Sequence, residues 1–220
     1  MSELSGPERA AASGQADSLV VFLHGYGADG NDLIGLAEPL GQHLPNTRFV
    51  APDAPQRSVN NPMGYLWFPI PWLDGSDPVA AMRDAASAFD TLNRYFDGLA
   101  EAGMPPDRTV VVGFSQGTMK ALHVLPPRPV PMAGIVGFSA RLLEPATVDD
   151  ESVSRPPVLL VHGEDDPMVP PSSMPEAAEA LTNAGVETYT HLSKGIGHGI
   201  GPDGLGLALQ FIRRQLGLEE

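Results

Sequence analysis

Residues 109–117 read TVVVGFSQG, so an apolar run passes directly into the motif G-x-S-x-G. The run is typical of a strand that is buried on both faces. The segment from Ser115 to about Leu125 is predicted to be a short helix. A strand, this motif and a helix in that order are the setting of a nucleophile elbow, in which Ser115 adopts a strained backbone conformation. Gly113 and Gly117 leave room where the helix and the strand come closest, so that the serine hydroxyl projects clear of the sheet.

Further apolar runs lie on both sides of this motif. The other predicted strands are residues 19–23, 48–51, 133–138, 157–162 and 186–192. Helical segments alternate with them, at residues 29–43, 78–102, 173–185 and 202–216. This alternation predicts a mostly parallel central sheet with helices on both faces. Together with the elbow, it indicates an α/β-hydrolase fold without a large cap domain, and its active site is expected at the carboxyl ends of the strands.

The longest predicted helix has clear end signals. Asp77 is its N-cap, Pro78 takes the first helical position, and Gly103 and Pro105 close it. Its apolar residues recur at helical spacing, and we expect all of them to lie in the core. They are Val79, Met82, Phe89, Leu92, Phe96 and Leu99.

The two ends of the chain differ in character. We expect residues 1–16 to be a flexible N-terminal tail and residues 17–220 to be a single α/β-hydrolase domain. The tail lacks the basic start and the apolar run of a signal peptide, and no later segment approaches a membrane-spanning stretch. These features predict a cytoplasmic protein without stable membrane insertion.

The composition excludes several functional classes. Lys and Arg number 13 against 27 Asp and Glu, which gives a formal net charge of −14 and disfavours nucleic acid as a partner. The absence of cysteine excludes a thiol nucleophile, a disulfide framework and a cysteine-built zinc site. The chain has neither a phosphate-binding glycine loop nor an H-E-x-x-H motif, so we expect no cofactor and no metal.

A serine hydroxyl is a weak nucleophile that needs a base and an acid to orient that base. Among the six histidines, His198 alone lies in a glycine-rich loop, Gly195-Ile196-Gly197-His198-Gly199, between the last predicted strand and the final helix. The fold places its base there. Asp166 follows a strand end and completes the order Ser, Asp, His, with Asp165 and Glu164 as competing candidates for the acid.

Two further segments are candidates for substrate contacts. The turn His24-Gly25-Tyr26-Gly27 follows the first buried strand, and a backbone N–H there is a candidate to hold an oxyanion together with that of Gln116. The alternative is that its glycines only make a tight turn. Residues 52–76 form a long excursion, which is usually functional or disordered. The candidate lining of an apolar acyl groove consists of Trp67, Phe68, Trp72, Met168 and Val169. The alternatives are lid packing and, for an exposed aromatic loop, a dimer contact.

With these motifs in this order, the chain from about Leu19 to Leu216 resembles the phospholipase/carboxylesterase family, which includes the acyl-protein thioesterases. The stretches that carry the resemblance are residues 22–33 (FLHGYGADGNDL), 51–55 (APDAP), 67–68 (WF), 113–117 (GFSQG) and 161–163 (VHG). The resemblance implies a cofactor-free hydrolase of esters, thioesters or lysophospholipids. It also implies that Ser115, Asp166 and His198 take the triad positions. The backbone N–H groups of Tyr26 and Gln116 would form the oxyanion hole.

Three residues depart from the family pattern. Pro69 follows Trp-Phe where Asp is common, Lys120 occupies an elbow-helix position that is usually apolar, and Gly199 follows the histidine where Glu is frequent. These departures leave the acyl-chain preference open. The chain also looks short of the small antiparallel strands that many relatives carry before their first buried strand.

The function expected from these residues is a serine carboxylesterase that acts on short- to medium-chain acyl esters through an acyl-enzyme. An acyl-protein thioesterase or a lysophospholipase is the enzymatic alternative. A non-catalytic binding protein of the same fold is the alternative from another class. The sequence leaves the oligomeric state open, with a homodimer as one alternative, and it does not identify the natural substrate.

Overall fold

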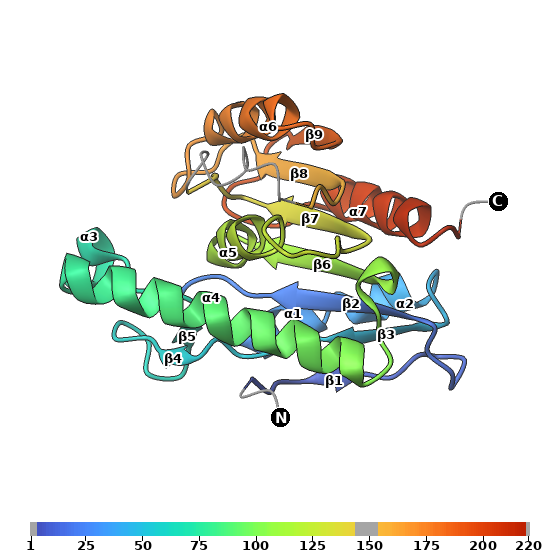
Figure 1. Cartoon of the computed structure of the whole chain (residues 1–220). Helices are drawn as coiled ribbons and strands as arrows, with labels where there is room; N and C mark the ends of the chain where they lie inside the picture. Colours follow the sequence, from blue (N-terminus) through green and yellow to red (C-terminus); the bar gives the residue numbers. More distant parts are fainter. Residues whose placement is uncertain (1–3, 144–153, 219–220) are drawn as a thin grey trace.

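A computed structural model describes residues 4–143 and 154–218 of the chain, except for the side chain of Trp72. Seven strands form one sheet in the order β1-β3-β2-β6-β7-β8-β9 (Figure 1). Their bounds are Glu8–Arg9 (β1), Ser18–Leu23 (β2), Thr47–Val50 (β3), Thr109–Phe114 (β6), Gly134–Phe138 (β7), Val158–Gly163 (β8) and Thr188–Ser193 (β9). Every neighbouring pair is parallel except the edge pair β1–β3. The mostly parallel sheet predicted from the apolar runs is therefore confirmed.

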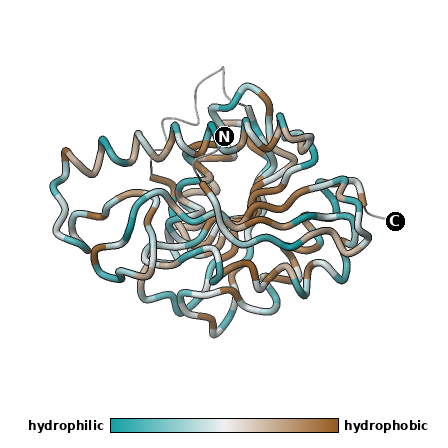
Figure 2. Tube along the Cα trace, turned by 90° about the horizontal axis from the view of Figure 1, so that it is seen from below, coloured by the Kyte–Doolittle hydropathy of each residue, from teal (hydrophilic) through white to brown (hydrophobic). Residues whose placement is uncertain are grey.

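Helices cover both faces of this sheet. One layer contains α4 (Pro78–Glu101), α5 (Gln116–Val124) and α6 (Ser173–Asn183), and the other contains α1 (Gly30–Ile34), α2 (Ala37–Gly41) and α7 (Pro202–Gln215). Strand β2 shows why both layers are needed, since Leu19, Val21 and Leu23 pack toward the first layer and Val20 and Phe22 toward the second. Figure 2 shows the hydrophobic stretches gathered in the strands between the layers.

The excursion between β3 and α4 has structure of its own. It contains the two-stranded hairpin of β4 (Gln56–Arg57) and β5 (Tyr65–Leu66) and the short helix α3 (Pro71–Asp74). The hairpin is tied to the turn after β2, because the amide of Gly27 donates to the carbonyl of Tyr65 over 2.8 Å. The excursion thus lies against the carboxyl end of the sheet.

Two helix predictions need correction. The segment predicted as one helix over residues 29–43 is divided into α1 and α2. Pro39 lies within the first turn of α2, where its missing N–H costs nothing, whereas in the interior of one long helix it would break a hydrogen bond. In α4, Val79 and Met82 were expected in the core but are 76% and 75% exposed.

The length of α4 explains this exposure. Its 24 residues span about 36 Å. A six-residue strand such as β2 spans about 20 Å. The N-terminal turns of α4 therefore extend past the strand ends next to α3, as Figure 1 shows. The large side chains of α4 that are buried in the core beside the sheet, such as Leu92 and Phe96, lie in its later turns.

The prediction of a flexible tail over residues 1–16 is wrong for the part of it that the structure describes. β1 pairs antiparallel with β3, and the amide of Ala51 donates to the carbonyl of Pro7 over 3.0 Å. Leu4 and Ala11 are buried. The expected lack of an antiparallel strand before the first buried strand is wrong for the same reason. A strand of two charged residues, Glu and Arg, has no apolar pattern that could predict it.

Within the described ranges, no helix is both long enough and apolar enough to cross a membrane.

Candidate active site

The turn between β6 and α5 has the strained geometry expected of an elbow. Ser115 has φ 52° and ψ −117°, a backbone conformation that residues other than glycine rarely adopt. Its amide donates to the carbonyl of Phe138 at the end of β7 over 2.8 Å, which holds the strained residue in place. A Cβ on Gly113 would lie 2.5 Å from the amide nitrogen of Thr118, and one on Gly117 would lie 1.9 Å from the carbonyl oxygen of Leu23. Both glycines are therefore required by close backbone approach.

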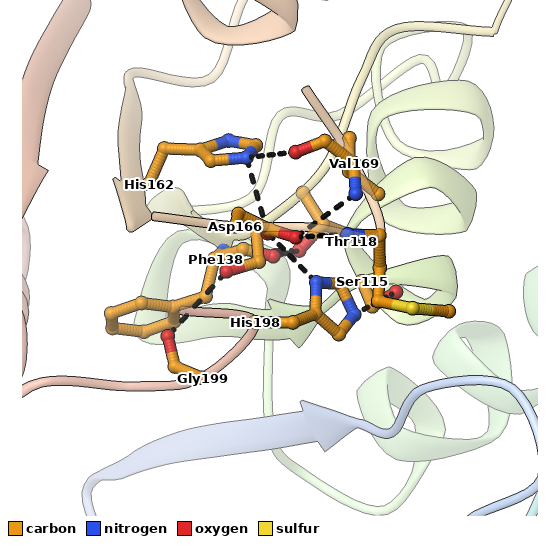
Figure 3. Close-up of polar contacts among 10 residues, drawn as sticks. Ser115, Thr118, Phe138, His162, Asp166, Val169, His198 and Gly199 are labelled. Carbon is orange, nitrogen blue, oxygen red and sulfur yellow. Dashed lines mark hydrogen bonds and ion pairs between the residues drawn. The ribbon is translucent and has the colours of Figure 1, made fainter. Parts of the chain in front are cut away.

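Three side chains meet at this turn (Figure 3). The Oγ of Ser115 lies 3.0 Å from Nε2 of His198, and Nδ1 of His198 lies 2.8 Å from Oδ2 of Asp166. Because the carboxylate can only accept, Nδ1 carries the proton and Nε2 is left to accept from the serine hydroxyl. The structure thus brings together the three residues that the sequence placed in the triad, from the ends of β6, β8 and β9.

The carboxylate of Asp166 is fully enclosed, with a side-chain exposure of 0%. Its Oδ1 accepts hydrogen bonds from the amides of Met168 at 2.8 Å and Val169 at 2.9 Å. Burial alone would raise the pKa of Asp166, but the hydrogen bonds from Val169, His198 and Met168 outweigh it and hold the pKa below its usual range. The group therefore stays ionised at neutral pH beside the imidazole.

The competing acids have different environments. Glu164 and Asp165 are exposed, and in the described part of the chain neither side chain bonds to His198. Of the three acidic residues in the run, only Asp166 points into the site.

His24 is a buried histidine with a structural role. Its Nδ1 lies 2.8 Å from the carbonyl of Gly25, so this nitrogen donates, and its Nε2 accepts from the amide of Ala54 over 2.9 Å. Burial lowers the pKa of His24, which keeps the ring neutral in this arrangement. The ring thereby fixes the start of the turn that contains Tyr26.

Two amide groups are available at the site. Gln116 is the first residue of α5, and helix geometry leaves its N–H without a partner in the helix. Tyr26 lies in the turn after β2. In the ranges that the structure describes, neither amide donates to a protein acceptor, and both residues line the same cavity as Ser115. Two unpaired N–H groups beside a serine hydroxyl are suited to bind an oxyanion.

The side chain of Gln116 joins the elbow to the excursion. Its Oε1 accepts from the amide of Trp67 over 2.9 Å, and its Nε2 donates to the carbonyl of Phe68 over 2.7 Å. The sequence predicted a role only for the backbone N–H of Gln116. This double contact ties residues 67 and 68 of the excursion to the first residue of α5.

A cavity of about 690 Å³ opens over Ser115 and is mostly apolar. Its apolar lining consists of Ala28, Leu33, Leu36, Phe68, Ile70, Leu73, Phe114, Met119, Leu143, Met168, Val169, Pro170 and Ile200. Phe68, Met168 and Val169, which were predicted to line an acyl groove, line this cavity together with Ser115. Two charged side chains, Asp32 and Arg141, also line it.

The two tryptophans of the predicted groove have different outcomes. Trp67 is fully buried outside the cavity lining, and its Nε1 donates to the carbonyl of His24 over 2.9 Å. Its assignment to the groove is wrong, because the indole instead fills the core and satisfies its N–H there. The side chain of Trp72 lies outside the described residues.

The three departures from the family pattern have separate surroundings. Lys120 is buried, with Nζ donating to the carbonyl of Ala85 over 2.7 Å and lying 5.8 Å from the ring centre of Phe68. Gly199 lines the cavity, and its carbonyl accepts from Oγ of Ser139 over 3.4 Å. Pro69 is half-buried next to Phe68.

Within the described residues, no group of three or more histidine, aspartate or glutamate side chains is arranged to hold a metal ion.

Comparison with known proteins finds relatives along nearly the whole chain. The sequence profile of phospholipase/carboxylesterase proteins matches residues 6–216. Acyl-protein thioesterase 1 of Gibberella zeae is 30% identical over 219 residues, which cover 93% of this chain and 93% of that protein. The crystal structure of esterase PE8 matches with a TM-score of 0.89 and 42% identity over 97% of this chain and 99% of that chain. The carboxylesterase of Bacillus cereus shares the fold at 16% identity, with a TM-score of 0.76 over 97% of this chain and 95% of that chain. The predicted α/β-hydrolase fold is confirmed.

Proposed function

The chain belongs to the phospholipase/carboxylesterase family and is an ester hydrolase, and we propose that it cleaves short- to medium-chain acyl esters through an acyl-enzyme on Ser115. The observation that carries this proposal is the continuous series of contacts from Asp166 through His198 to Ser115, at 2.8 and 3.0 Å, at the floor of an apolar cavity. Nucleophile, base and orienting acid are each within hydrogen-bond reach of the next.

In the first half of the reaction, Oγ of Ser115 attacks the acyl carbon while Nε2 of His198 takes the hydroxyl proton. The carbonyl oxygen becomes an oxyanion, which accepts hydrogen bonds from the amides of Tyr26 and Gln116. When the tetrahedral intermediate collapses, the bond to the alcohol oxygen breaks and the imidazolium returns its proton to the leaving alkoxide. The acyl group remains on Ser115.

In the second half, a water molecule takes the place of the alcohol. His198 removes one of its protons as the water oxygen attacks the acyl carbon. The imidazolium then returns that proton to Oγ as the bond to Oγ breaks and the acid is released. Asp166 remains a carboxylate throughout, in line with its depressed pKa, and stabilises the imidazolium that forms twice in each cycle.

The cavity supports an acyl chain of limited length. Its volume of about 690 Å³ lies in the range of small-molecule sites. Phe68 and Met168 line it, so methylene groups of an acyl chain would leave water for an apolar surface. Each buried methylene contributes about 0.8 kcal/mol to binding.

Thioesters are the second candidate substrates. They undergo the same acyl transfer to serine, and one relative at 30% identity is named acyl-protein thioesterase 1. The preferred substrate class can be found by comparing the rates of hydrolysis of an ester and a thioester that carry the same acyl group. The acyl-enzyme is common to both substrates, so only its rate of formation differs.

The test is hydrolysis of p-nitrophenyl acetate, butyrate and octanoate by the purified protein. Wild type should turn over all three, and Ser115→Ala should lose at least about 1,000-fold in kcat on each. Ser87→Ala, on the exposed face of α4, is the matched control and should behave as wild type. Equal turnover by wild type and Ser115→Ala would contradict the proposal.

A further inference from the structure

A second histidine, His162, lies behind the acid of the proposed triad. It is on β8 with a side-chain exposure of 1%, and its Nε2 lies 3.0 Å from the carbonyl oxygen of Val169. A carbonyl oxygen only accepts, so this nitrogen must carry the proton. The same Nε2 lies 3.3 Å from Oδ2 of Asp166, the oxygen that also contacts His198 (Figure 3).

These contacts close a ring around the carboxylate. The amide of Val169 donates to Oδ1 of Asp166 over 2.9 Å, while the carbonyl of the same residue accepts from His162. The amide of Met168 donates to Oδ1 as well. Two backbone donors therefore occupy Oδ1, and Oδ2 lies between two imidazole rings.

We infer that His162 is a positioning residue for Asp166: it fixes the turn through Val169 and directs Oδ2 of Asp166 toward His198. This inference rests on the proposed roles of Asp166 and His198. It assigns His162 no contact with substrate. Its effect reaches the reaction only through the carboxylate that orients the base.

The position of the Nε2 proton also has an electrostatic consequence. The N–H of His162 near Oδ2 partly neutralises the negative charge of Asp166, so that this charge acts less strongly on His198. Removing this N–H should strengthen the pull of Asp166 on the imidazolium and move the acid limb of the pH–rate profile to higher pH. In the described residues, His162 and His198 are the titratable side chains that face this carboxylate, and the neighbouring Glu164 and Asp165 are exposed.

Two variants separate positioning from simple packing. His162→Phe keeps a ring but removes the donor, whereas His162→Gln keeps an N–H that can reach the same acceptor. With p-nitrophenyl butyrate, we expect His162→Phe to lower kcat roughly 10- to 100-fold with little change in KM. Its acid limb should move up by roughly half a pH unit. His162→Gln should recover most of kcat and the wild-type limb.

The control is His43→Gln, which changes an exposed histidine before β3 and should leave the profile unchanged. If His162→Phe retains the wild-type kcat and acid limb, the inference is overturned. Equal losses in the Phe and Gln variants, without movement of the limb, would show a purely structural role and would also overturn it.

A measurement on the wild-type protein does not depend on whether a variant folds. In protein labelled with ¹⁵N-histidine, long-range proton–nitrogen spectra at pH 8 should show His162 protonated at Nε2. Protonation at Nδ1 instead would overturn the inference. Ester hydrolysis that survives Ser115→Ala would reject the proposed function itself. Serine-dependent hydrolysis with the wrong His162 tautomer would reject only the positioning role.

Discussion

The phenolic hydroxyl of Tyr26 donates a hydrogen bond to Oδ2 of Asp74 over 2.9 Å. Tyr26 supplies one of the two amides proposed to hold the oxyanion, and Asp74 ends α3, whose Leu73 lines the cavity. Burial raises the pKa of Asp74, but hydrogen bonds from Ser76, Ile70 and Tyr26 outweigh it, so its pKa lies below the usual range. The hydrogen bond between Tyr26 and the ionised Asp74 thus ties α3, which forms part of the cavity wall, to the turn that contains Tyr26.

Tyr26→Phe tests this connection, since it removes the hydroxyl and keeps the backbone amide. Without the bond, α3 is held less firmly, so contacts with a long acyl chain should suffer most. We expect kcat/KM for p-nitrophenyl octanoate to fall about 3- to 10-fold and that for the acetate to change less than about 2-fold. Tyr65→Phe removes a hydroxyl outside the cavity lining and is the matched control. Equal losses on both esters would argue against the connection.

Met168→Ala tests the acyl groove itself. The side chain of Met168 lines the cavity and is otherwise exposed, so its removal should not disturb the core. Its amide, which holds Asp166, is unchanged. We expect a loss of about 5-fold in kcat/KM on the octanoate and almost none on the acetate, because only the longer chain reaches it. Met63→Ala is the control, because Met63 is also exposed but lies outside the lining, and it should change neither rate. A uniform loss in Met168→Ala would exclude the groove.

Gly117→Ala tests the elbow as a packing constraint. The new Cβ would lie 1.9 Å from the carbonyl oxygen of Leu23. To relieve this clash, the backbone of α5 or of the end of β2 would have to move, and both are packed in the core. We expect a loss of about 3 kcal/mol or more in the free energy of unfolding, measured in urea. Gly206→Ala is the control, because a Cβ there meets nothing within 4 Å and α7 should gain about 0.5–1 kcal/mol. A neutral Gly117→Ala would contradict the described contact.

Asp166→Asn tests the orientation of the base. The amide cannot stabilise the imidazolium, and its NH₂ group favours the wrong tautomer of His198, so kcat should fall about 10⁴-fold with little effect on KM. Glu164→Gln is the matched control, since this exposed neighbour makes no contact with His198 in the described residues. Near-normal turnover in Asp166→Asn would refute the assignment.

The pH dependence of stability gives an independent check on Asp166. Its folded-state pKa is depressed, so its ionisation stabilises the fold fully above the pKa of the unfolded carboxyl, about 3.9. That contribution is lost as pH falls through the lower folded-state pKa. The free energy of unfolding of wild type minus that of Asp166→Asn should therefore be constant above about pH 5. Below that pH it should decrease, because wild type loses the contribution of the ionised carboxylate. If this difference instead increases as the pH falls, the pKa of Asp166 is not depressed in the folded state.

The sequence predicted the parts of the site that depend on chain order. The apolar run before Ser115, the strand end before Asp166 and the glycine loop around His198 each mark a carboxyl strand end, and parallel strands bring such ends together. The roles of the side chains that support these residues were not predictable in the same way. Whether Trp67 faces the cavity or the core depends on three-dimensional packing, which cannot be predicted from a short stretch of apolar residues.

Other failures had similar physical causes. The spacing of Val79 and Met82 on α4 is correctly helical, but burial also depends on how far the sheet extends beneath the helix. β1 is too short and too polar to give a pattern. His162 had one signal, its place at a strand end four residues before Asp166, which becomes informative only once the turn between them is known.

The most direct test of the account is covalent labelling of the active protein with a p-nitrophenyl alkylphosphonate, followed by peptide mass spectrometry. We predict release of one equivalent of p-nitrophenol and a single adduct on Ser115. Ser115→Ala should take up no label. An adduct on Ser139, the other described non-glycine residue with positive φ, or ester turnover without any adduct, would contradict Ser115 as the nucleophile.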